Sequence, residues 1–564
     1  MGSEQVTKNK EVFNAAAASA VVNELRGSFS AGKTRSYEWR VAQLKSMFKM
    51  LDEHEPAIVA ALRDDISKPE LEASLYEVGM LKGSIRLALK ELKRWMAPEK
   101  AKTEITTFPS SAEIVSEPLG VVLIISAWNY PFLLSLDPVV GAIAAGNALI
   151  LKPSEIAPAS SSLLAKLVGQ YMDSSSIRVV EGAVAETSAL LEQKWDKIFY
   201  TGNGRVARIV MAAAAKHLTP VVLELGGKSP VVVDSGINLQ VATRRIIMGK
   251  WGCNNGQACI SPDYIVTTKD YASKLVDSLK CELENFFGKK PMESKDLSRI
   301  VNSNHFARLS NMLDDDKVAG KIVHGGERDK SNLRIAPTIL LDVPQDSLIM
   351  SEEIFGPLLP ILTVSIELLY SSALFFFNDL LFLRNAFSVK MYEADKPYEI
   401  HLRQAPSVLL HQLFFRLNTR NIINFPCICG TISDKVDKIE DSFDIINSGT
   451  KPLAAYIFTN NKKLREQFVT MVSAGGVVVN DTTLHLAVSS LPFGGVQESG
   501  MGSYHGKFSF DAFSHKKAVL YRSFAGDAAL RYPPYTQGKL RLMKALMSGS
   551  IIGIIRALLG FPKA

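Results

Sequence analysis

The chain has 564 residues, which is too long for a single hydrophobic core and predicts two or three domains. With 47% hydrophobic and 21% charged residues the composition is that of a globular protein, and the net charge of +7 comes from scattered lysines and arginines, so we expect no binding to nucleic acid. The five cysteines show no regular spacing, which excludes a disulfide scaffold and indicates a reducing compartment. Because the N-terminal residues resemble neither a signal peptide nor a transit peptide, we expect a cytoplasmic protein.

Residues 11–98 carry apolar side chains at every third or fourth position, with few helix-breaking residues before Pro98. This spacing is typical of amphipathic helices. We therefore predict helices within 11–29, 37–66 and 75–96.

From Ile114 onward, short apolar segments alternate with helical stretches and are separated by Gly and Pro. Strands this hydrophobic are typical of a parallel sheet that is covered on both faces. We therefore predict an α/β fold with one parallel-sheet domain before about Gly226 and a second after it. The strands are expected within residues 121–128, 147–153, 177–182, 197–202, 220–227, 230–236, 263–269, 321–326, 337–344, 453–459 and 475–481.

Residues 365–436 interrupt this pattern, because they are rich in phenylalanine and their only glycine is Gly430. A buried helical insertion is one interpretation. A membrane span is a second, although Asn378, Asp379 and Arg384 shorten the apolar run to less than the ~20 residues that a span requires. The third, which we adopt as a hypothesis, is that the segment is not part of the ancestral fold and stems from a faulty gene model.

Residues 526–564 form a basic and apolar tail, in which no acidic residue follows Asp527. Its apolar run Ile551–Leu559 is too short to span a membrane and contains Arg556. The tail predicts an interfacial helix on an anionic membrane surface, and a helix that docks on its own protein is the alternative.

Polar residues follow or end several predicted strands, at the edge where open α/β sheets bind ligands. Asn129 follows the strand in 121–128, Lys152 and Glu155 follow the next strand, and Glu224 stands among apolar residues before two glycines. Taken singly, Asn129 is better explained as a turn former, Lys152 and Glu155 as solvated loop charges, and Glu224 as a surface charge at the end of a strand. Burial of Glu224 would instead raise the pKa of its carboxyl and suit it to general-base catalysis.

The segment TGNGRVAR places Gly202, Gly204 and Ala207 directly after a predicted strand and at the start of a predicted helix. This matches the relaxed G-x-G-x-x-G/A pattern of loops that bind nucleotide phosphates. It therefore indicates a nucleotide site.

Cys259 lies in GCNNGQACIS, a small and polar segment that Pro262 follows. A structural cysteine usually lies among apolar side chains. Together with a carboxylate, an amide donor and a nucleotide site, such a cysteine suits covalent catalysis coupled to hydride transfer. We interpret the neighbouring Cys253 as ancillary, and a reversible disulfide with Cys259 is the alternative.

Seven motifs occur along the chain in the order SAWNYPFLL, GNALILKPSE, FYTGN, LELGGKSP, GQACISPDY, EEIFGP and LPFGG with ESGMG. In this order the chain resembles NAD(P)-dependent aldehyde dehydrogenases, and among them the class 3, fatty-aldehyde-type family in a form similar to plant members. The resemblance covers residues from about 20 to 525, without 365–436. It implies two Rossmann-like parallel-sheet domains, one cofactor-binding and one catalytic, and a small β oligomerisation arm.

The same resemblance implies the order of the domains. Residues 1–225 are expected to form mostly the NAD(P)-binding domain, with the arm at about 100–120, and residues 226–486 the catalytic domain. Residues 487–525 return to the oligomerisation and cofactor side, and residues 526–564 are the tail.

The resemblance implies catalytic roles that suit the chemistry. Cys259 would attack the aldehyde carbonyl to form a thiohemiacetal, which the Asn129 amide and the backbone N–H of Cys259 would stabilise as an oxyanion hole. Loss of hydride would leave a thioester, and Glu224 would activate the water that hydrolyses it to the carboxylic acid. The expected substrates are medium-chain, long-chain or lipid-derived aliphatic aldehydes.

The resemblance also implies the cofactor, NAD, NADP or both, and no metal. Lys152 and Glu155 would bind the adenosine ribose near the glycines Gly202 and Gly204. Glu353 would bind the nicotinamide ribose, and Phe355 would pack against the nicotinamide end.

A homodimer is expected from the resemblance, through the arm and the strands after Lys516, with peripheral membrane contact through the tail. Two small departures from the family occur at Ala207 and Gln497, where glycine is usual, and a positive φ at Gln497 would cost ~1 kcal/mol or more. The large departure is segment 365–436. It leaves the alternative of a catalytically impaired aldehyde dehydrogenase fold that serves as a binding or scaffold protein.

Overall fold

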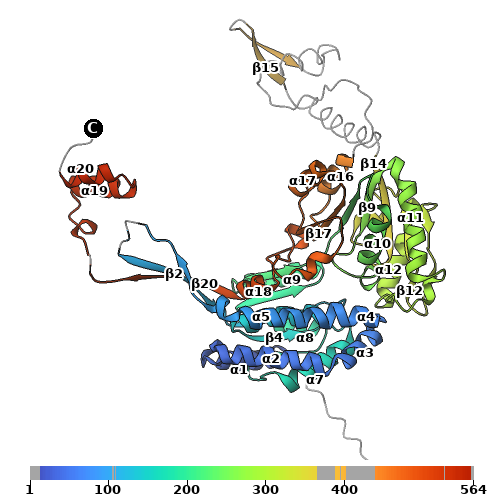
Figure 1. Cartoon of the computed structure of the whole chain (residues 1–564), viewed down its shortest axis with the longest axis horizontal. Coiled ribbons are helices and arrows are strands. Elements are labelled where there is room, and N and C mark those ends of the chain that lie inside the picture. Colours follow the sequence, from blue (N-terminus) through green and yellow to red (C-terminus); the bar gives the residue numbers. More distant parts are fainter. Residues whose placement is uncertain are drawn as a thin grey trace, which may run out of the picture.

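The computed structural model describes residues 13–104, 107, 109–364, 439–525 and 527–559, and the backbone of two strands at 388–393 and 396–401. Two sheets carry the fold, N-terminal helices line one end, and an arm of strands leads away from it (Figure 1). The hypotheses about segment 365–436 lie outside the described residues. Of this segment the structure describes only the backbone of an antiparallel pair, β15 (Ser388–Glu393) and β16 (Lys396–His401).

The N-terminal helices follow the predicted amphipathic pattern. Their apolar faces include Leu44, Leu62 and Leu92, none of which is exposed. The predicted helix 37–66 is divided at His54, which ends one helix and precedes Pro56 in the next. The region comprises α1 (Ala15–Ser30), α2 (Tyr37–Glu53), α3 (Glu55–Ile66), α4 (Glu70–Glu72), a π-helical segment (Ala73–Gly79) and α5 (Met80–Met96).

The first sheet has the strand order β19-β7-β6-β3-β4-β5. Alternate residues of its central strand face two cores: Val121, Leu123 and Ile125 pack with α1 and the helices after β5 and β6, whereas Val122 and Ile124 pack with α2 and α5. The prediction of a sheet that is covered on both faces is therefore confirmed. The strands are β3 (Val121–Ile125), β4 (Ala148–Lys152), β5 (Ile177–Val179), β6 (Lys197–Thr201), β7 (Val221–Glu224) and β19 (Gly500–Met501).

Helices connect these strands in the right positions for a parallel sheet. They are α6 (Leu133–Ala145), α7 (Pro158–Tyr171), α8 (Val184–Leu191) and α9 (Gly204–Ala215), with α18 (Gly506–Ala512) after β19. One edge differs from the prediction, because β19 joins β7 in antiparallel orientation.

The second sheet has the order β10-β13-β14-β9-β8-β17-β18 and is parallel except for the edge strand β10. Its strands are β8 (Pro230–Val233), β9 (Tyr264–Thr268), β10 (Ile322–His324), β13 (Thr338–Leu341), β14 (Leu358–Val364), β17 (Ala454–Phe458) and β18 (Gly476–Val479), with a small separate pair β11 (Arg328–Asp329) and β12 (Arg334–Ile335). Its helices are α10 (Leu239–Lys250), α11 (Lys269–Phe287), α12 (Ser303–Leu313), α13 (Leu348–Ser351), α16 (Ser442–Ser448) and α17 (Lys462–Met471). The predicted α/β fold with two parallel-sheet layers is thus confirmed.

The arm is a three-stranded antiparallel sheet of β1 (Glu99–Ala101), β2 (Ser110–Pro118) and β20 (Ser514–Arg522). Beyond it lie the tail helices α19 (Gln537–Met547) and α20 (Ile551–Leu558), apart from both large sheets (Figure 1). Ile551 is 73% exposed and Leu558 is 66% exposed, so the apolar residues of α20 are not covered by the described chain. Among the described residues, no helix combines the length and the apolar character that crossing a membrane requires.

Candidate active site

Three of the predicted site residues are brought to one edge of the first sheet. Ile125, the last residue of β3, lies opposite Lys152 of β4, and Thr201 of β6 lies opposite Glu224 of β7. Because these strands are parallel, their carboxyl ends meet there, and the loop that carries Asn129 leaves from the same edge. The strand pattern of the sequence therefore placed these polar residues correctly.

Asn129 and the loop before Cys259 are joined directly. The Asn129 side chain is 3% exposed, and its Nδ2 donates to the carbonyl oxygen of Gln257 at 3.1 Å. An amide nitrogen carries two hydrogens, so one remains for a second acceptor. An amide that is fixed in this way and keeps one free hydrogen can donate to a developing negative charge, and its acceptor Gln257 lies two positions before Cys259.

The Cys259 thiol is free and partly buried. The carbonyl of the next residue, Ile260, accepts a 2.5 Å hydrogen bond from the Tyr456 hydroxyl of β17, which fixes the loop on the second sheet. Burial, and then the charges of Glu224 and Glu353, raise the pKa of the Cys259 thiol. Both carboxylates therefore lie within electrostatic reach of the sulfur, and the thiol needs a nearby positive charge to ionise.

Glu224 ends β7 and is 3% exposed. Among the described residues, neither of its carboxylate oxygens has a hydrogen-bond partner. Burial raises the pKa of this carboxyl well above its usual value. A buried carboxylate without protein donors is a strong proton acceptor that can bind a water molecule or a reacting group.

Glu353 and Phe355 reach the site from the loop between α13 and β14. The Glu353 carboxylate lies so close to Gly226 that a side chain at that position would collide with it. Burial raises the pKa of Glu353 to about 8. The Phe355 ring meets the ring of Trp128, next to Asn129, with their centroids 5.5 Å apart. These contacts place Glu353 beside Gly226, two residues after Glu224, and Phe355 beside Trp128, next to Asn129.

Arg308 of α12 holds this loop, although the sequence did not single it out. It donates to the carbonyl oxygens of Glu353 at 3.1 Å and of Ile354 at 2.6 Å. Phe355 itself has a φ of 50°, a backbone conformation that a bulky residue adopts only when its surroundings enforce it. The loop is therefore held by Arg308 at the two residues before Phe355 and by the contact of the Phe355 ring with Trp128.

Lys152 and Glu155 form an ion pair at 2.9 Å. Lys152 is buried, whereas the Glu155 side chain is 43% exposed, so its oxygens are accessible to the hydroxyl groups of a ribose. This donor and acceptor pair at the carboxyl end of β4 fits the adenosine end of NAD(P).

Gly202 follows β6 and Gly204 is the first residue of α9, as the loop pattern predicted. Gly202 is required by a close approach, because a side chain there would collide with the Tyr200 hydroxyl. Gly204 begins α9, and the exposed cations Arg205 and Arg208 stand on its first turns. A helix N-terminus with adjacent arginines fits the diphosphate of a dinucleotide.

Sequence reasoning missed the residues that hold the segment of Asn129 through its backbone and through the neighbouring Tyr130. Lys68 donates to the Asn129 carbonyl oxygen at 3.0 Å and to Glu77 at 2.6 Å, and both charged side chains are completely buried. Glu72 accepts from the Tyr130 hydroxyl and from the backbone N–H of Asn254. The segment KPELEASLYE gave one usable signal, namely charges that a helix of this amphipathic pattern would bury.

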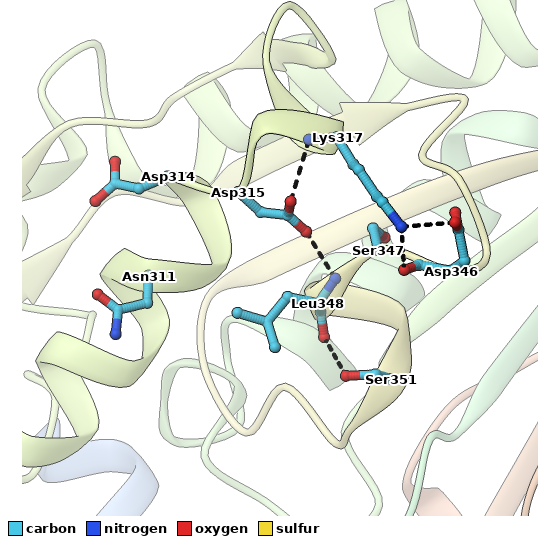
Figure 2. A pocket seen from close by; sticks show the side chains of 8 residues that line it. All are labelled: Asn311, Asp314, Asp315, Lys317, Asp346, Ser347, Leu348 and Ser351. Atoms are coloured by element: carbon cyan, nitrogen blue, oxygen red, sulfur yellow. Dashed lines mark hydrogen bonds and ion pairs between the residues drawn. The ribbon is translucent and has the colours of Figure 1, made fainter.

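Figure 2 shows a separate open cavity of about 590 Å³ between α12 and α13 that contains none of the predicted site residues. Its acids have partners: Asp346 pairs with Lys317 at 2.6 Å, and Asp315 accepts from the backbone N–H of Leu348 at 2.7 Å. Within the described part of the chain, no group of three or more His, Cys, Asp or Glu side chains is arranged to hold a metal ion.

Two Rossmann-like sheets, with a cysteine loop, an amide and a buried carboxylate between them, define a class of protein, and comparison with known proteins names it. The sequence model of the aldehyde dehydrogenase family matches residues 3–368 and 432–519, so the chain belongs to the aldehyde dehydrogenase family, oxidoreductases that act on aldehydes. Within it, the chain is 63% identical over 551 residues to aldehyde dehydrogenase family 3 member H1 of Arabidopsis thaliana, covering 98% of this chain and 99% of the relative.

More distant relatives agree. The rat aldehyde dehydrogenase described as dimeric and NADP-preferring is 40% identical over 518 residues, covering 92% of this chain and 97% of that protein. The substrate-bound structure of AldH from Staphylococcus aureus superposes with a TM-score of 0.79 at 34% identity, covering 94% of this chain and 99% of the other. The predicted family, fold, enzyme class and NAD(P) cofactor are thus confirmed. The family match leaves out residues 369–431, which lie inside the segment that the sequence set apart.

Proposed function

We propose that this protein oxidises medium-chain, long-chain or lipid-derived aliphatic aldehydes to carboxylic acids with NAD, NADP or both. The observation that carries the proposal is the arrangement around Cys259: a tied amide donor at Asn129 and an unpartnered buried carboxylate at Glu224. An aldehyde between them would meet a nucleophile, an oxyanion donor and a base at once.

The first step is attack on the aldehyde carbon by the Cys259 thiolate, which forms when the thiol releases its proton to solvent. The carbonyl oxygen takes up the negative charge, and the free hydrogen of the Asn129 amide and the backbone N–H of Cys259 stabilise it. Since Asn129 is already fixed by Gln257, little reorganisation is needed when this charge develops. The product is a thiohemiacetal.

When bound, NAD(P)⁺ supplies the hydride acceptor and a positive charge near the thiol. Lys152, Glu155, Gly202 and Gly204 would hold its adenosine and diphosphate parts. Glu353 would bind the nicotinamide ribose, and the Phe355 ring, fixed against Trp128, would pack on the nicotinamide end. The thiohemiacetal becomes a thioester once its hydride is lost.

Hydrolysis of the thioester is assigned to Glu224. Its carboxylate binds the attacking water and takes one proton from it, so that a hydroxide adds to the thioester carbonyl and the thiolate of Cys259 leaves. The raised pKa of Glu224 makes the proton transfer more favourable than an ordinary carboxylate would.

Two exposed leucines on the segment that carries Glu72 support the preference for aliphatic substrates. Leu71 is 73% exposed and Leu75 is 52% exposed, and both lie within three residues of Glu72, which contacts the loop of Cys259. Exposed leucines of this size offer an apolar surface to an alkyl chain.

We further propose a homodimer in which the β20 edge of the arm pairs with a second copy. β20 is the outer strand of its sheet, and Leu520 and Tyr521 are 58% and 52% exposed. The exposed apolar residues of α20, with Arg556 and Lys544 nearby, support peripheral contact with an anionic membrane from the cytoplasm. The division into a cofactor domain to residue 225 and a catalytic domain to residue 486 belongs to the same proposal.

The test is NADH and NADPH formation by the purified chain with hexanal and hexadecanal, beside Cys259→Ala. We expect the variant to lose activity by about 10⁴-fold or more, because no other group can form the thioester. Cys281→Ser is the matched control, since Cys281 is an exposed free thiol remote in sequence from the site. Equal activity of Cys259→Ala and wild type would refute the mechanism.

A further inference from the structure

The segment that precedes α5 contacts both halves of the oxyanion site. Glu72 is the last residue of α4, and its side chain is almost fully buried at 7% exposure. One oxygen, Oε1, accepts two hydrogen bonds, from the Tyr130 hydroxyl at 3.0 Å and from the backbone N–H of Asn254 at 2.8 Å. Tyr130 is the neighbour of Asn129, and Asn254 begins the turn that leads to Cys259.

The turn that Glu72 holds has an unusual backbone. Asn254 and Asn255 have φ values of 50° and 51°, a left-handed conformation that asparagine adopts more readily than most residues. The Asn254 side chain donates to the Asn129 carbonyl at 3.1 Å, and the Asn129 amide donates to the Gln257 carbonyl at 3.1 Å. Hydrogen bonds therefore connect Glu72 to Asn254, Asn254 to Asn129, and Asn129 to Gln257.

The neighbouring charges hold the other end of the Asn129 segment. Lys68 contacts the Asn129 carbonyl, and its ammonium lies 3.6 Å from the centre of the Tyr130 ring. Glu77 accepts from the backbone N–H groups of Phe132 at 2.9 Å and Leu133 at 3.0 Å, where α6 begins. Lys68 and Glu77 thus fix the segment from one side only, whereas Glu72 alone among the three contacts the loop of Cys259.

We propose that Glu72 is a positioning residue that sets the distance between the Asn129 amide and the Cys259 sulfur by bridging Tyr130 to the backbone of Asn254. This inference rests on the proposed roles of Asn129 and Cys259. Glu72 acts through the oxyanion donor and does not touch the substrate.

The charge state of Glu72 supports this role. Burial raises the pKa of its carboxyl to about 7, while Lys68, Tyr130 and the N–H of Asn254 act in the opposite direction. The ionised carboxylate is the stronger acceptor for two donors. The titratable groups that face it are Lys68, Tyr76, Glu77, Tyr130 and Cys253.

The experiment is a double-mutant cycle on kcat/KM for hexanal. We expect Glu72→Gln, which keeps the volume and removes the charge, to lower kcat/KM roughly ten- to a hundredfold, since small misplacements of catalytic groups have effects of this size. In an Asn129→Ala background the same change should lower it less than about threefold. Equal losses in both backgrounds, or a loss below twofold in the wild type, would overturn the proposal.

Two further measurements separate positioning from a folding defect. In Glu72→Gln, iodoacetamide should alkylate the Cys259 thiol at a rate within about threefold of that in the wild type, because the thiol itself is not changed. The wild-type pH profile of kcat/KM should contain a rise near pH 7 that Glu72→Gln lacks, and a rise that persists in the variant would contradict the role of the charge.

If Glu72→Gln fails to fold, Tyr130→Phe removes one of the two bonds and keeps the packing of the ring. It should show the same non-additivity with Asn129→Ala, and additive losses would overturn the proposal. Glu70→Gln is the matched control on the same short helix, because its side chain is 76% exposed, and it should leave kcat/KM unchanged. If Asn129→Ala alone has no effect, it is the proposed function that fails rather than the role of Glu72.

Discussion

Asn129 and Glu224 lie at the same edge of one sheet, but Asn129 has hydrogen-bond partners and the Glu224 carboxylate has none among the described residues. The Asn129 side-chain amide donates to the Gln257 carbonyl oxygen, and Lys68 and Asn254 both donate to the backbone carbonyl oxygen of Asn129. Glu224 has no partner for either oxygen among the described residues, although it is equally buried. In the mechanism that we propose, a donor that meets developing charge gains from being fixed, whereas a base that receives a proton gains from being left without donors.

The largest effect that tests this contrast is expected at Glu224. Glu224→Gln should lower kcat by about 10²- to 10⁴-fold, because the amide cannot take a proton from water. The first turnover should still release NADH rapidly, so stopped-flow traces should show a burst followed by a very slow phase. A variant without a burst would place Glu224 before the thioester and break the comparison.

Asn129→Ala should lower kcat/KM by about 10²- to 10³-fold, the usual effect of losing one oxyanion-hole donor. No burst should be seen, because formation of the thiohemiacetal becomes limiting. Asn129→Asp keeps the shape and removes the donor, so it should be at least as slow. A fast Asn129→Asp variant would show that the tied amide is only structural.

The His485 ring contacts the ring of Tyr456, whose hydroxyl holds the loop of Cys259 at Ile260. A change in the protonation of His485 therefore tests how this loop is supported. Burial, and then the charge of His505, lower the pKa of His485 to about 4, below the usual 6.5. The unfolded chain therefore binds the extra proton first, and stability is complete above about pH 6.5 and is lost as the pH falls toward 4. The loss should be on the order of 2–3 kcal/mol between pH 7 and 4.5.

Denaturant unfolding at these two pH values measures this loss directly. His485→Gln should flatten this part of the pH dependence, since it has no ionisable ring. An unchanged slope in the variant would mean that His485 is not the group responsible.

The smallest effect is expected for a substitution of Gln497, and it concerns the free energy of unfolding. Gln497 has a φ of 56°, so the strain that the sequence indicated for a non-glycine residue is present. Gln497 begins a short 3₁₀ helix whose last residue, Ser499, accepts from the N–H of Leu225 at 3.1 Å. Because the side chain is exposed, Gln497→Gly should raise the free energy of unfolding by about 0.5–1 kcal/mol.

Activity is the control for that variant. The kcat should stay within about twofold of wild type, because the Glu224 carboxylate has no contact with Gln497 in the described hydrogen bonds. A lower free energy of unfolding for Gln497→Gly would show that contacts of the Gln497 side chain outweigh the strain of its positive φ.

The sequence predicted the parts of the site that depend on local order. Asn129, Lys152 and Glu224 follow or end hydrophobic strands, and parallel strands bring such ends together whatever the rest of the fold does. The helix division at His54 and the antiparallel edge strand β19 were not predicted, because local periodicity does not determine where helices break or which strand joins an edge.

The contacts of Glu72 were beyond prediction for a different reason. Its partner Asn254 is 182 positions away, and the contact depends on how two loops meet in space. Neither residue type is diagnostic alone, and the segment around Glu72 is π-helical, which no apolar spacing in the sequence indicated. Sequence patterns identified the candidate catalytic residues, but they did not identify Glu72, which contacts the loops that carry them.

The pairing of β2 with β20 also has a consequence for biosynthesis. Glu117 and Lys517 form an ion pair across a separation of 400 residues, so until β20 is synthesised β2 has only the short strand β1 as a partner. At a synthesis rate of 5–20 residues per second the strand waits roughly 20 to 80 s for β20. During that time we expect the acids Glu113 and Glu117 of this strand to oppose pairing with other copies of the chain, as charges on an open strand edge do.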